Sequence, residues 1–341
     1  MRLATVLALG LAVLSGQAAG QQEQKLLLRG AGATFPAPLY KKWIAEYARV
    51  EPKTAIDYKE VGSGEGTKRF LERAVDFGAS DAGLSDEQLA RARDAKLVPT
   101  TAGMIALVYN LPGLAGPLKL PRAVYPEILA GRIAKWNDAR IQAANPGLNL
   151  PNREIALAVR LDASGTTFNL TNHLNAISET WRQPSLGVRN LVAWEGLALL
   201  ARGNEGVAAA VQRSHWTLGY VEYGYAKRLG LAIALLENKS GRYVAPSAAS
   251  GAAAIAANLN EVPANLRVYL PDPAGDDSYP IVSLTWLLVR ERHPEPAKAE
   301  ALKRFVEWAL TTGQPYGAEL GFVPLPPGLV ERARAVARTI Q

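Results

Sequence analysis

Apolar and polar positions along this chain follow two periods that succeed each other. Residues Ala55–Val61 alternate as a half-buried strand does, whereas Leu39–Val50 places its apolar side chains at helical spacing. Further strands are predicted at Lys25–Leu28, Phe77–Ser80, Met104–Tyr109, Ile155–Val159, Leu218–Val221 and Pro280–Val289. Further helices are predicted at Thr67–Ala74, Pro126–Ala130, Asp138–Ala144, from near Thr166, and at Gly206–Arg213, Ser247–Leu259, Pro296–Thr311 and Leu329–Arg338. This succession predicts an α/β fold with mostly parallel sheets.

The length of the chain predicts more than one domain. Its 341 residues exceed what one hydrophobic core usually organises, so we expect two domains. A stretch rich in proline and glycine, Leu111–Pro121, interrupts the alternation and is the candidate crossing from the first domain to the second.

The beginning of the chain has the features of an export signal. Arg2 supplies a positive charge, Leu3–Leu14 is a short apolar run, and Ser15–Gly20 is rich in small residues, as a cleavage region is. The apolar run is too short to span a bilayer, and a later one, Ile281–Val289, has the length of a buried strand. We therefore predict a signal peptide at residues 1–20 and export to a bacterial periplasm.

Composition and charge add two constraints. The chain has no cysteine, so we expect neither disulfides nor a thiol for lipid attachment, and predict a soluble protein held together by packing alone. The formal net charge is +7, but Lys and Arg are interspersed with Asp and Glu. This pattern favours a generally basic surface over a nucleic-acid site.

Four short segments share one chemistry, because each places Ser, Thr or Gly where a helix would begin. They are Gly30–Pro38 (GAGATFPAP), Val61–Lys68 (VGSGEGTK), Asp76–Ser85 (DFGASDAGLS) and Val159–Phe168 (VRLDASGTTF). Hydroxyls, open backbone N–H groups at helix N-termini and a single guanidinium, Arg160, are what a small anion needs. Together the segments predict phosphate binding, although each alone is also compatible with an ordinary helix cap.

The first two segments predict helix N-termini rather than a nucleotide loop. Thr34 is placed to cap a helix whose first turn contains Pro36 and Pro38. Ser63 lies between two glycines after a strand, but Thr67 interrupts the Gly-Lys-Ser/Thr order of a nucleotide-binding loop. A second helix N-terminus opened by serine fits this segment better.

The other two segments carry the charged groups. Asp81 is either a turn carboxylate or an acceptor that tolerates a protonated oxyanion and repels a fully ionised one. Arg160 and Asp162 lie on one side of a strand end, so Asp162 can hold the guanidinium, although a surface salt bridge has the same spacing. Ser164, followed by Gly and Thr, forms another helix start.

Enzymatic signatures are weak. The three histidines, His173, His215 and His293, are far apart, and no Asp, Glu or His cluster has metal-ligand spacing. A nucleophile elbow of the form GxSxG does not surround Ser164. We expect no catalytic residues, no metal and no cofactor.

In their order along nearly the whole chain, these motifs closely resemble those of the periplasmic phosphate-binding proteins of bacterial phosphate ABC transporters. Further matching segments are GRIAKWND (Gly131–Asp138), NPGLNLP (Asn145–Pro151) and GYVEYGYAK (Gly219–Lys227). The resemblance implies a type II periplasmic-binding-protein fold: two α/β lobes, joined by hinge strands, with the ligand cleft between them. It places lobe I at residues 25–104 plus 279–341 and lobe II at residues 105–278.

The resemblance also implies a set of phosphate-binding residues. Lobe I would contribute Thr34, Phe35, Ser63 and Asp81, and lobe II would contribute Arg160, Asp162, Ser164, Gly165 and Thr166. Side-chain hydroxyls would come from Thr34, Ser63, Ser164 and Thr166, and backbone N–H groups from Phe35, Gly165 and Thr166. Asp81 would accept the phosphate proton, and Asp162 would orient Arg160.

Two positions depart from the family pattern. Glu65 stands where small residues are common, and Ala163 replaces a frequent glycine. An acidic Glu65 either weakens anion binding or faces solvent, and we expect it to face solvent.

The function implied by the resemblance is high-affinity binding of inorganic phosphate by a monomer that closes by hinge motion and delivers the anion to a membrane permease. Two alternatives remain open. One is a related extracellular phosphatase, against which the missing nucleophile–base pair argues. The other is a surface or secreted phosphate-binding protein without a transport role.

Overall fold

The computed structural model describes residues 25–259 and 262–341. The predicted signal peptide, residues 1–20, lies outside these ranges. No helix in the described ranges is both long enough and apolar enough to cross a membrane.

Helices and strands follow one another along most of the chain. The strands are β1 (Leu26–Gly32), β2 (Thr54–Glu60), β3 (Phe77–Ser80), β4 (Ala95–Asn110), β5 (Lys119–Leu120), β6 (Ala156–Arg160), β7 (Ala198–Ala201), β8 (Thr217–Glu222), β9 (Ala232–Ile233), β10 (Leu235–Glu237), β11 (Tyr243–Val244) and β12 (Val282–Arg290). The helices are α1 (Ala37–Val50), α2 (Ser63–Leu71), α3 (Asp86–Arg91), α4 (Tyr125–Leu129), α5 (Ala139–Ala144), α6 (Gly165–Ile177), α7 (Gly203–Arg213), α8 (Tyr223–Leu229), α9 (Ala248–Ala256), α10 (Pro296–Leu310), α11 (Tyr316–Leu320) and α12 (Pro327–Ala337).

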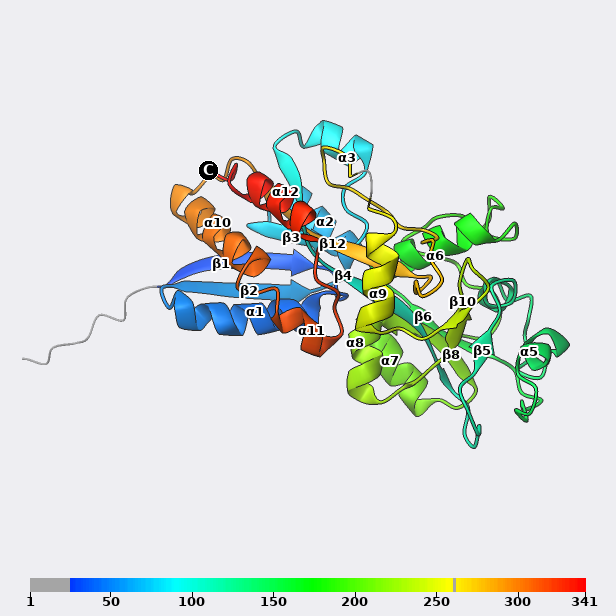
Figure 1. Ribbon diagram of the computed structural model, residues 1–341. Helices are drawn as coiled ribbons and strands as arrows, with labels where there is room; N and C mark the ends of the chain where they lie inside the picture. The colour runs from blue at the N-terminus through cyan, green and yellow to red at the C-terminus, as the bar shows by residue number, and fades with distance from the viewer. Residues whose placement is uncertain (1–24, 260–261) are drawn as a thin grey trace, which may run out of the picture.

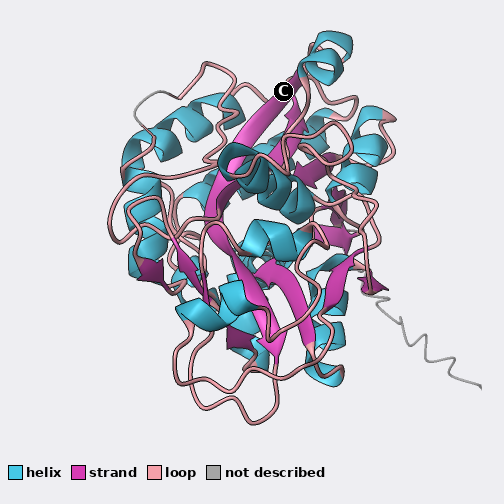
Figure 2. Ribbon diagram, turned by 90° about the vertical axis from the view of Figure 1, so that its right-hand side faces the viewer, coloured by secondary structure: helices cyan, strands magenta, loops and turns pink. Residues whose placement is uncertain are grey.

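One large mixed sheet runs through the elongated molecule in the order β2-β1-β3-β12-β4-β8-β6-β7, with β9 beside β4 (Figure 1). The outer groups, β1–β3 at one end and β6–β8 at the other, contain parallel pairs. The central strands β4 and β12 are antiparallel to each other, and they are also antiparallel to β8 and β3, respectively. The expectation of mostly parallel sheets is therefore right for the two ends and wrong for the centre. Figure 2 shows helices on both sides of the strands.

The chain crosses from the β1–β3 side to the β6–β8 side inside β4. This strand pairs with β12 up to Met104 and with β8 from Ile105 onward. The return crossing lies beside it, because the N–H of Ile105 donates to the Ile281 carbonyl at 2.9 Å and the Tyr279 hydroxyl donates to the Ile105 carbonyl at 3.1 Å. The predicted crossing at Leu111–Pro121 is wrong, since that stretch follows the crossing.

The extent of β4 shows why its first part was missed in the sequence. Only Met104–Tyr109 has a clear apolar pattern, whereas Pro99 and neighbouring threonines obscure the preceding residues. The register against β12 shifts between Thr285 and Trp286, where Trp286 pairs with Pro99, and such an irregularity accommodates a residue without an N–H group. Burial of β4 against both sides of the molecule, rather than the local pattern of apolar residues, makes this strand longer than the sequence predicts.

Helix α1 positions one side of the site, because its first residue, Ala37, lies within the Gly30–Pro38 segment. Its Trp43 side chain is fully buried, and the indole N–H donates to the Gly313 carbonyl at 2.6 Å. Tyr40 stacks on Trp43 with ring centroids 5.5 Å apart, and its hydroxyl contacts the Thr100 hydroxyl on β4 at 2.7 Å. The helix is thereby held against the sheet on the β1–β3 side.

Candidate functional site

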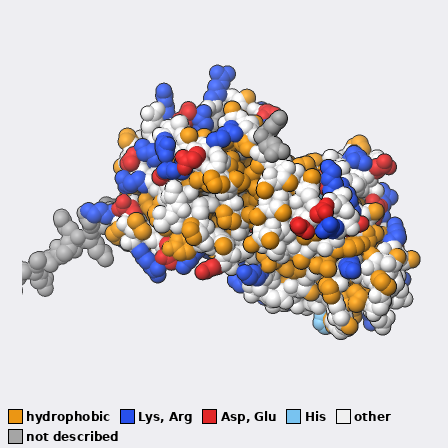
Figure 3. Space-filling model, in the orientation of Figure 1, with side chains coloured by type: hydrophobic (Ala, Val, Ile, Leu, Met, Phe, Trp, Pro, Cys, Tyr) orange, Lys and Arg blue, Asp and Glu red, His pale blue; other side chains and the backbone are white. Residues whose placement is uncertain are grey.

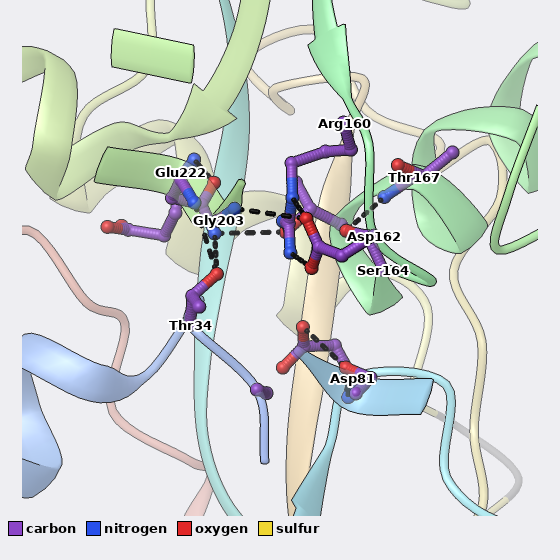
Figure 4. A network of polar contacts seen from close by, with 12 residues as sticks. Thr34, Asp81, Arg160, Asp162, Ser164, Thr167, Gly203 and Glu222 are labelled. Carbon is purple, nitrogen blue, oxygen red and sulfur yellow. Dashed lines mark hydrogen bonds and ion pairs between the residues drawn. The ribbon is translucent and has the colours of Figure 1, made fainter. Parts of the chain in front are cut away.

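The four predicted segments meet where the two sides of the molecule touch; Figure 4 shows Thr34, Asp81 and Arg160 from three of them, and the Ser63 hydroxyl of the fourth contacts Asp81. Thr34 lies between β1 and α1, Ser63 begins α2, and Asp81 follows β3. Arg160 ends β6, opposite them. The contact between the sides is close, because a Cβ atom on Gly165 would lie 2.5 Å from the Ser63 Oγ and 2.6 Å from the Asp81 Cβ.

Arg160 is the central cation, and its side chain is almost fully buried. Its Nε donates to Oδ1 of Asp162 at 2.8 Å, and its Nη2 donates to Oδ2 of the same carboxylate. Its Nη1 donates more weakly to the Thr166 hydroxyl at 3.4 Å. These contacts use three of the five guanidinium N–H donors, so two have no partner among the described residues. The expected pairing of Arg160 with Asp162 is present and buried.

The Asp162 carboxylate stays ionised beside this guanidinium. Burial opposes its ionisation, but the hydrogen bond and charge of Arg160 and the N–H of Gly203, at 3.0 Å from Oδ1, together hold the pKa of Asp162 below its usual range. The pair is therefore a fixed ion pair that orients the two remaining N–H donors of Arg160.

Asp81 is the acidic group on the opposite wall and is fully buried. The Thr285 hydroxyl donates to its Oδ1 at 2.7 Å, and the Ser63 hydroxyl donates to its Oδ2 at 3.3 Å. Burial raises the pKa of Asp81 to about 7, although the Thr285 hydrogen bond, the Arg160 charge and the Ser63 hydrogen bond act in the opposite direction. A carboxyl group that titrates near neutrality is suited to share a proton with an anion.

Open backbone donors come from two helix N-termini and from the segment before α1. The N–H groups of Phe35, Ser63, Gly165 and Thr166 have no hydrogen-bond partner among the described residues. Residues at the first turn of a helix cannot use their N–H groups within the helix, and the helix dipole adds partial positive charge there. These four groups are therefore free to bind an anion.

Ser164 caps α6 as the sequence indicates, because its Oγ accepts the N–H of Thr167 at 3.1 Å. Ala163, the departure from the family pattern, uses its backbone: its carbonyl accepts the N–H of Gly64 at 2.9 Å across the two sides. The missing glycine therefore does not prevent the two walls from meeting.

Two predicted residues act differently from the simplest expectation. Helix α1 has Pro36 as its N-cap and no side-chain cap, so the interpretation of Thr34 as a helix cap is wrong. The Thr34 Oγ1 instead accepts the backbone N–H of Asn204 at 3.1 Å and its Nδ2 at 2.9 Å. The Phe35 ring packs edge-on against Phe322, so only the backbone of Phe35 faces the site.

Sequence reasoning missed three buried residues that support the site. Asn204, near the start of α7, bonds to Thr34, and the Tyr225 hydroxyl donates to the Thr34 carbonyl at 2.7 Å. Thr285 binds Asp81 from the middle of β12. The Gly-Asn pair that opens α7 has the same helix-start signal as the other segments and could have been found; Thr285 lies in an apolar run with no local signal.

A cavity of about 720 Å³ lies beside the site, and Thr34, Asp162 and Gly203 are among its lining residues. Glu65 also lines it, partly exposed, and pairs with Arg69 at 2.7 Å. The hydrogen bond from Arg69 lowers the pKa of Glu65. The negative charge of Glu65 is therefore offset at the mouth of the site.

Metal-ligand geometry is not found in the described ranges, where no group of three or more His, Asp and Glu side chains could hold an ion. His173 is buried and contacts the Tyr125 hydroxyl at 2.7 Å, so it belongs to the core. The site is built to hold an anion through hydrogen bonds.

The comparisons with known proteins agree with this geometry. A family model described as "PBP superfamily domain" matches residues 15–312. The "Phosphate-binding protein PstS" of Pasteurella multocida is 38% identical over 317 residues, which cover 93% of this chain and 91% of that protein. This chain belongs to the PstS family of phosphate-binding proteins. The "Phosphate-binding protein PstS" of Methanocaldococcus jannaschii is 35% identical over 328 residues, which cover 90% of this chain and 84% of that protein.

Solved structures show the same fold as this PstS family member. A high-affinity periplasmic phosphate-binding protein, PfluDING, bound with phosphate, matches with a TM-score of 0.74 and 21% identity over 91% of this chain and 93% of its own. The phosphate-binding protein of Stenotrophomonas maltophilia matches with a TM-score of 0.71 and 22% identity over 91% and 93% of the two chains. The predicted fold class is thus confirmed.

Proposed function

We propose that this PstS family member binds inorganic phosphate and delivers it to an ABC-type phosphate permease. The observation that carries the proposal is the composition of the site: free N–H donors surround one buried guanidinium, and Asp81, with a pKa raised to about 7, faces them. Phosphate at neutral pH carries both negative charge and a proton, and it matches both features. The names of the relatives and the phosphate bound to PfluDING support the proposal.

Each predicted residue has a role in this proposal. The proposed hydroxyl donors are Thr34, Ser63, Ser164 and Thr166; the Ser63 hydroxyl would turn its proton from Asp81 Oδ2 to the anion on binding. Backbone donors are Phe35, Gly165 and Thr166, to which the structure adds the free N–H of Ser63. Arg160 contributes its two remaining N–H groups, Asp162 orients it, and Asp81 accepts the phosphate proton.

Closure of two lobes completes the mechanism. We assign residues 25–104 plus 279–341 to lobe I and residues 105–278 to lobe II; the change of partner along β4 after Met104 supports this boundary. The contact of Gly64 with Ala163 joins the lobes directly. An anion held by both lobes stabilises the closed form, because the open form offers only half of its contacts.

The chain is a binding protein and not an enzyme, in line with the relatives, which are named for phosphate binding. The proposal places it in the periplasm as a soluble monomer without a lipid anchor. The absence of cysteine supports the last point, because the sequence has no thiol for lipid attachment. On the face shown in Figure 3, Lys and Arg are interspersed with Asp and Glu, so this face has no uniform basic surface for nucleic acid. The permease is the expected partner.

Calorimetric titration with phosphate, arsenate and sulfate tests the proposal. We expect saturable phosphate binding and, at pH 8, negligible sulfate binding, because Asp81 is ionised above its pKa of about 7 and fully ionised sulfate has no proton to share with it. Arg160→Lys should weaken phosphate binding by about 100-fold, because an ammonium group cannot keep the bidentate geometry. The matched control is Arg122→Lys, which alters a second bidentate pair, with Asp272, outside the site.

Two outcomes would contradict the proposal. Absence of a phosphate titration would remove it, and turnover of a chromogenic phosphate ester, lost in Arg160→Ala, would revive the phosphatase alternative. Growth on limiting phosphate after deletion of the gene, with and without a permease, separates transport from a surface or secreted role.

A further inference from the structure

Asn204 occupies a central position between the two proposed lobes, although it belongs to none of the four anion-binding segments. It is fully buried near the N-terminus of α7. Its Nδ2 donates to the Thr34 hydroxyl at 2.9 Å and to the Thr166 hydroxyl at 3.1 Å. One amide group therefore joins a hydroxyl of lobe I to a hydroxyl of lobe II.

The orientation of this amide is determined by its third contact. The Asn204 Oδ1 accepts the backbone N–H of Glu222 at 2.9 Å, and a backbone N–H can only donate. A flipped amide would place Nδ2 against that N–H group and leave both without an acceptor. Nδ2 must therefore face the two hydroxyls, with one hydrogen for each.

The consequence concerns the hydroxyl protons of the two threonines. The Thr34 Oγ1 accepts two N–H donors, both from Asn204. The Thr166 Oγ1 also accepts two, from Nδ2 of Asn204 and from Nη1 of Arg160. A hydroxyl has two lone pairs and one proton, so both lone pairs of each hydroxyl are in use and only the proton remains. Each hydroxyl can then only donate to a ligand.

We propose that Asn204 is a positioning residue that makes Thr34 and Thr166 obligate hydrogen-bond donors toward the bound anion. The proposal rests on the proposed function, because it assigns a role at the same site. Without the amide, each hydroxyl could turn its proton away and present a lone pair to the anion, which is repulsive. With it, the two protons are oriented before the ligand arrives, so their reorientation costs nothing on binding.

The test replaces the amide in two ways and measures phosphate affinity by calorimetry. Asn204→Leu keeps the volume and neutrality but removes both donors, and we expect an affinity loss of about tenfold or more. Asn204→Asp replaces the donors by an acceptor that draws the hydroxyl protons away from the ligand, and we expect a loss of about 100-fold or more. A role in packing alone would leave the leucine variant close to the wild type.

Matched controls use Asn145, another buried asparagine, which is remote from the site. Its Nδ2 also donates twice, to the Lys119 and Ile141 carbonyls, and its Oδ1 accepts the N–H of Lys119. Asn145→Leu and Asn145→Asp lose the same number of hydrogen bonds, so they report the cost to the fold. We expect their phosphate affinity to stay within about threefold of the wild type, because they leave the hydroxyls unchanged.

The outcomes separate this inference from the proposed function. Failure of the wild type to bind phosphate would refute the function itself. Phosphate binding by Asn204→Leu within about threefold of the wild type would overturn the positioning role, even if Asn204→Asp bound weakly, since charge repulsion would then explain the weak binding. If the leucine variant does not fold, Asn204→Ala takes its place with the same criterion.

Discussion

Asp81 and Arg160 define the chemistry of the site at the scale of single residues. Three N–H groups of Arg160 donate to Asp162 and Thr166, and the other two remain for a ligand. Asp81 is held by Thr285 and Ser63 and has its pKa raised to about 7, mainly by burial. Arg160 attracts an anion electrostatically. The ionised Asp81 carboxylate repels the anion unless a proton lies between that carboxylate and an oxygen of the anion.

Asp81→Asn should therefore change selectivity more than it changes the fold. The amide keeps the size of the side chain but removes the negative charge that repels sulfate. We expect the phosphate-to-sulfate affinity ratio, measured by calorimetry near pH 8, to fall by about 100-fold or more, chiefly because sulfate gains affinity. Arsenate, which has the same shape and protonation pattern as phosphate, serves as the control and should follow phosphate. An unchanged ratio would refute the role of Asp81.

Helix N-termini supply the remaining donors, and they are not equivalent. Helix α7 also begins at the site, but its first two N–H groups are taken by Asp162 and Thr34. The N–H group of Ser63, which begins α2, and those of Gly165 and Thr166, which begin α6, have no such partners, so these groups are left to bind an anion. In α6 this depends on Gly165, since a side chain there would meet the opposite wall.

Gly165→Ala tests that close approach. The added Cβ would lie 2.5 Å from the Ser63 Oγ and 2.6 Å from the Asp81 Cβ, so the two walls could not meet. We expect phosphate affinity to fall by about 100-fold, while the thermal midpoint changes little, because alanine favours the helix itself.

The control for this variant is Gly328→Ala. Gly328 lies in the first turn of α12, and a Cβ on it would meet nothing within 4 Å. The Gly328→Ala variant should bind phosphate with the same affinity as the wild type. Equal affinities of the two variants would show that the walls need not approach as closely as in this structure.

At the scale of the whole molecule, the crossing between the two sides contains a buried carboxyl group. Glu222 pairs with Ile105, the residue at which β4 changes partner, and is fully buried. Its Oε1 accepts the N–H of Gly224 at 2.8 Å, whereas its Oε2 has no partner in the described part of the chain. Burial raises the pKa of Glu222 to about 8, against the hydrogen bonds of the Gly224 and Tyr225 backbones.

This pKa gives a signed prediction for stability. Between the unfolded pKa, about 4.5, and the folded pKa, about 8, the folded state binds more protons, so the free energy of unfolding falls as pH rises. Glu222→Gln mimics the protonated form and does not suffer this loss. In urea unfolding of phosphate-free protein, the free energy of unfolding of the variant, relative to that of the wild type, should rise by up to about 1.4 kcal/mol per pH unit across this window.

The control is Glu87→Gln, which changes an exposed carboxylate on α3. Its stability curve should run parallel to that of the wild type across the same pH range. A parallel curve for Glu222→Gln as well would mean that Glu222 does not enter the folded protein in its protonated form.

Sequence reasoning reached the elements and the anion-binding segments because both depend on near neighbours. The pairing of Arg160 with Asp162 and the cap of Ser164 on Thr167 follow from spacings of two and three residues. The first part of β4 and the crossing point escaped, because pairing with β12 and β8 decides them. The cap assigned to Thr34 was wrong for the same reason, as its partner is distant.

The sequence by itself determined which groups can bind an anion: hydroxyls, glycines and one arginine at helix starts, in an order shared with the PstS family. Only the tertiary structure decided which way the hydroxyl protons point and at which pH the buried carboxyl group titrates. The Thr34 hydroxyl takes its partner from 170 positions along the chain, and Asp81 takes one of its own from 204 positions away. The direction of a hydroxyl proton and the pKa of a buried carboxyl group depend on such distant contacts and on burial, which local sequence does not specify.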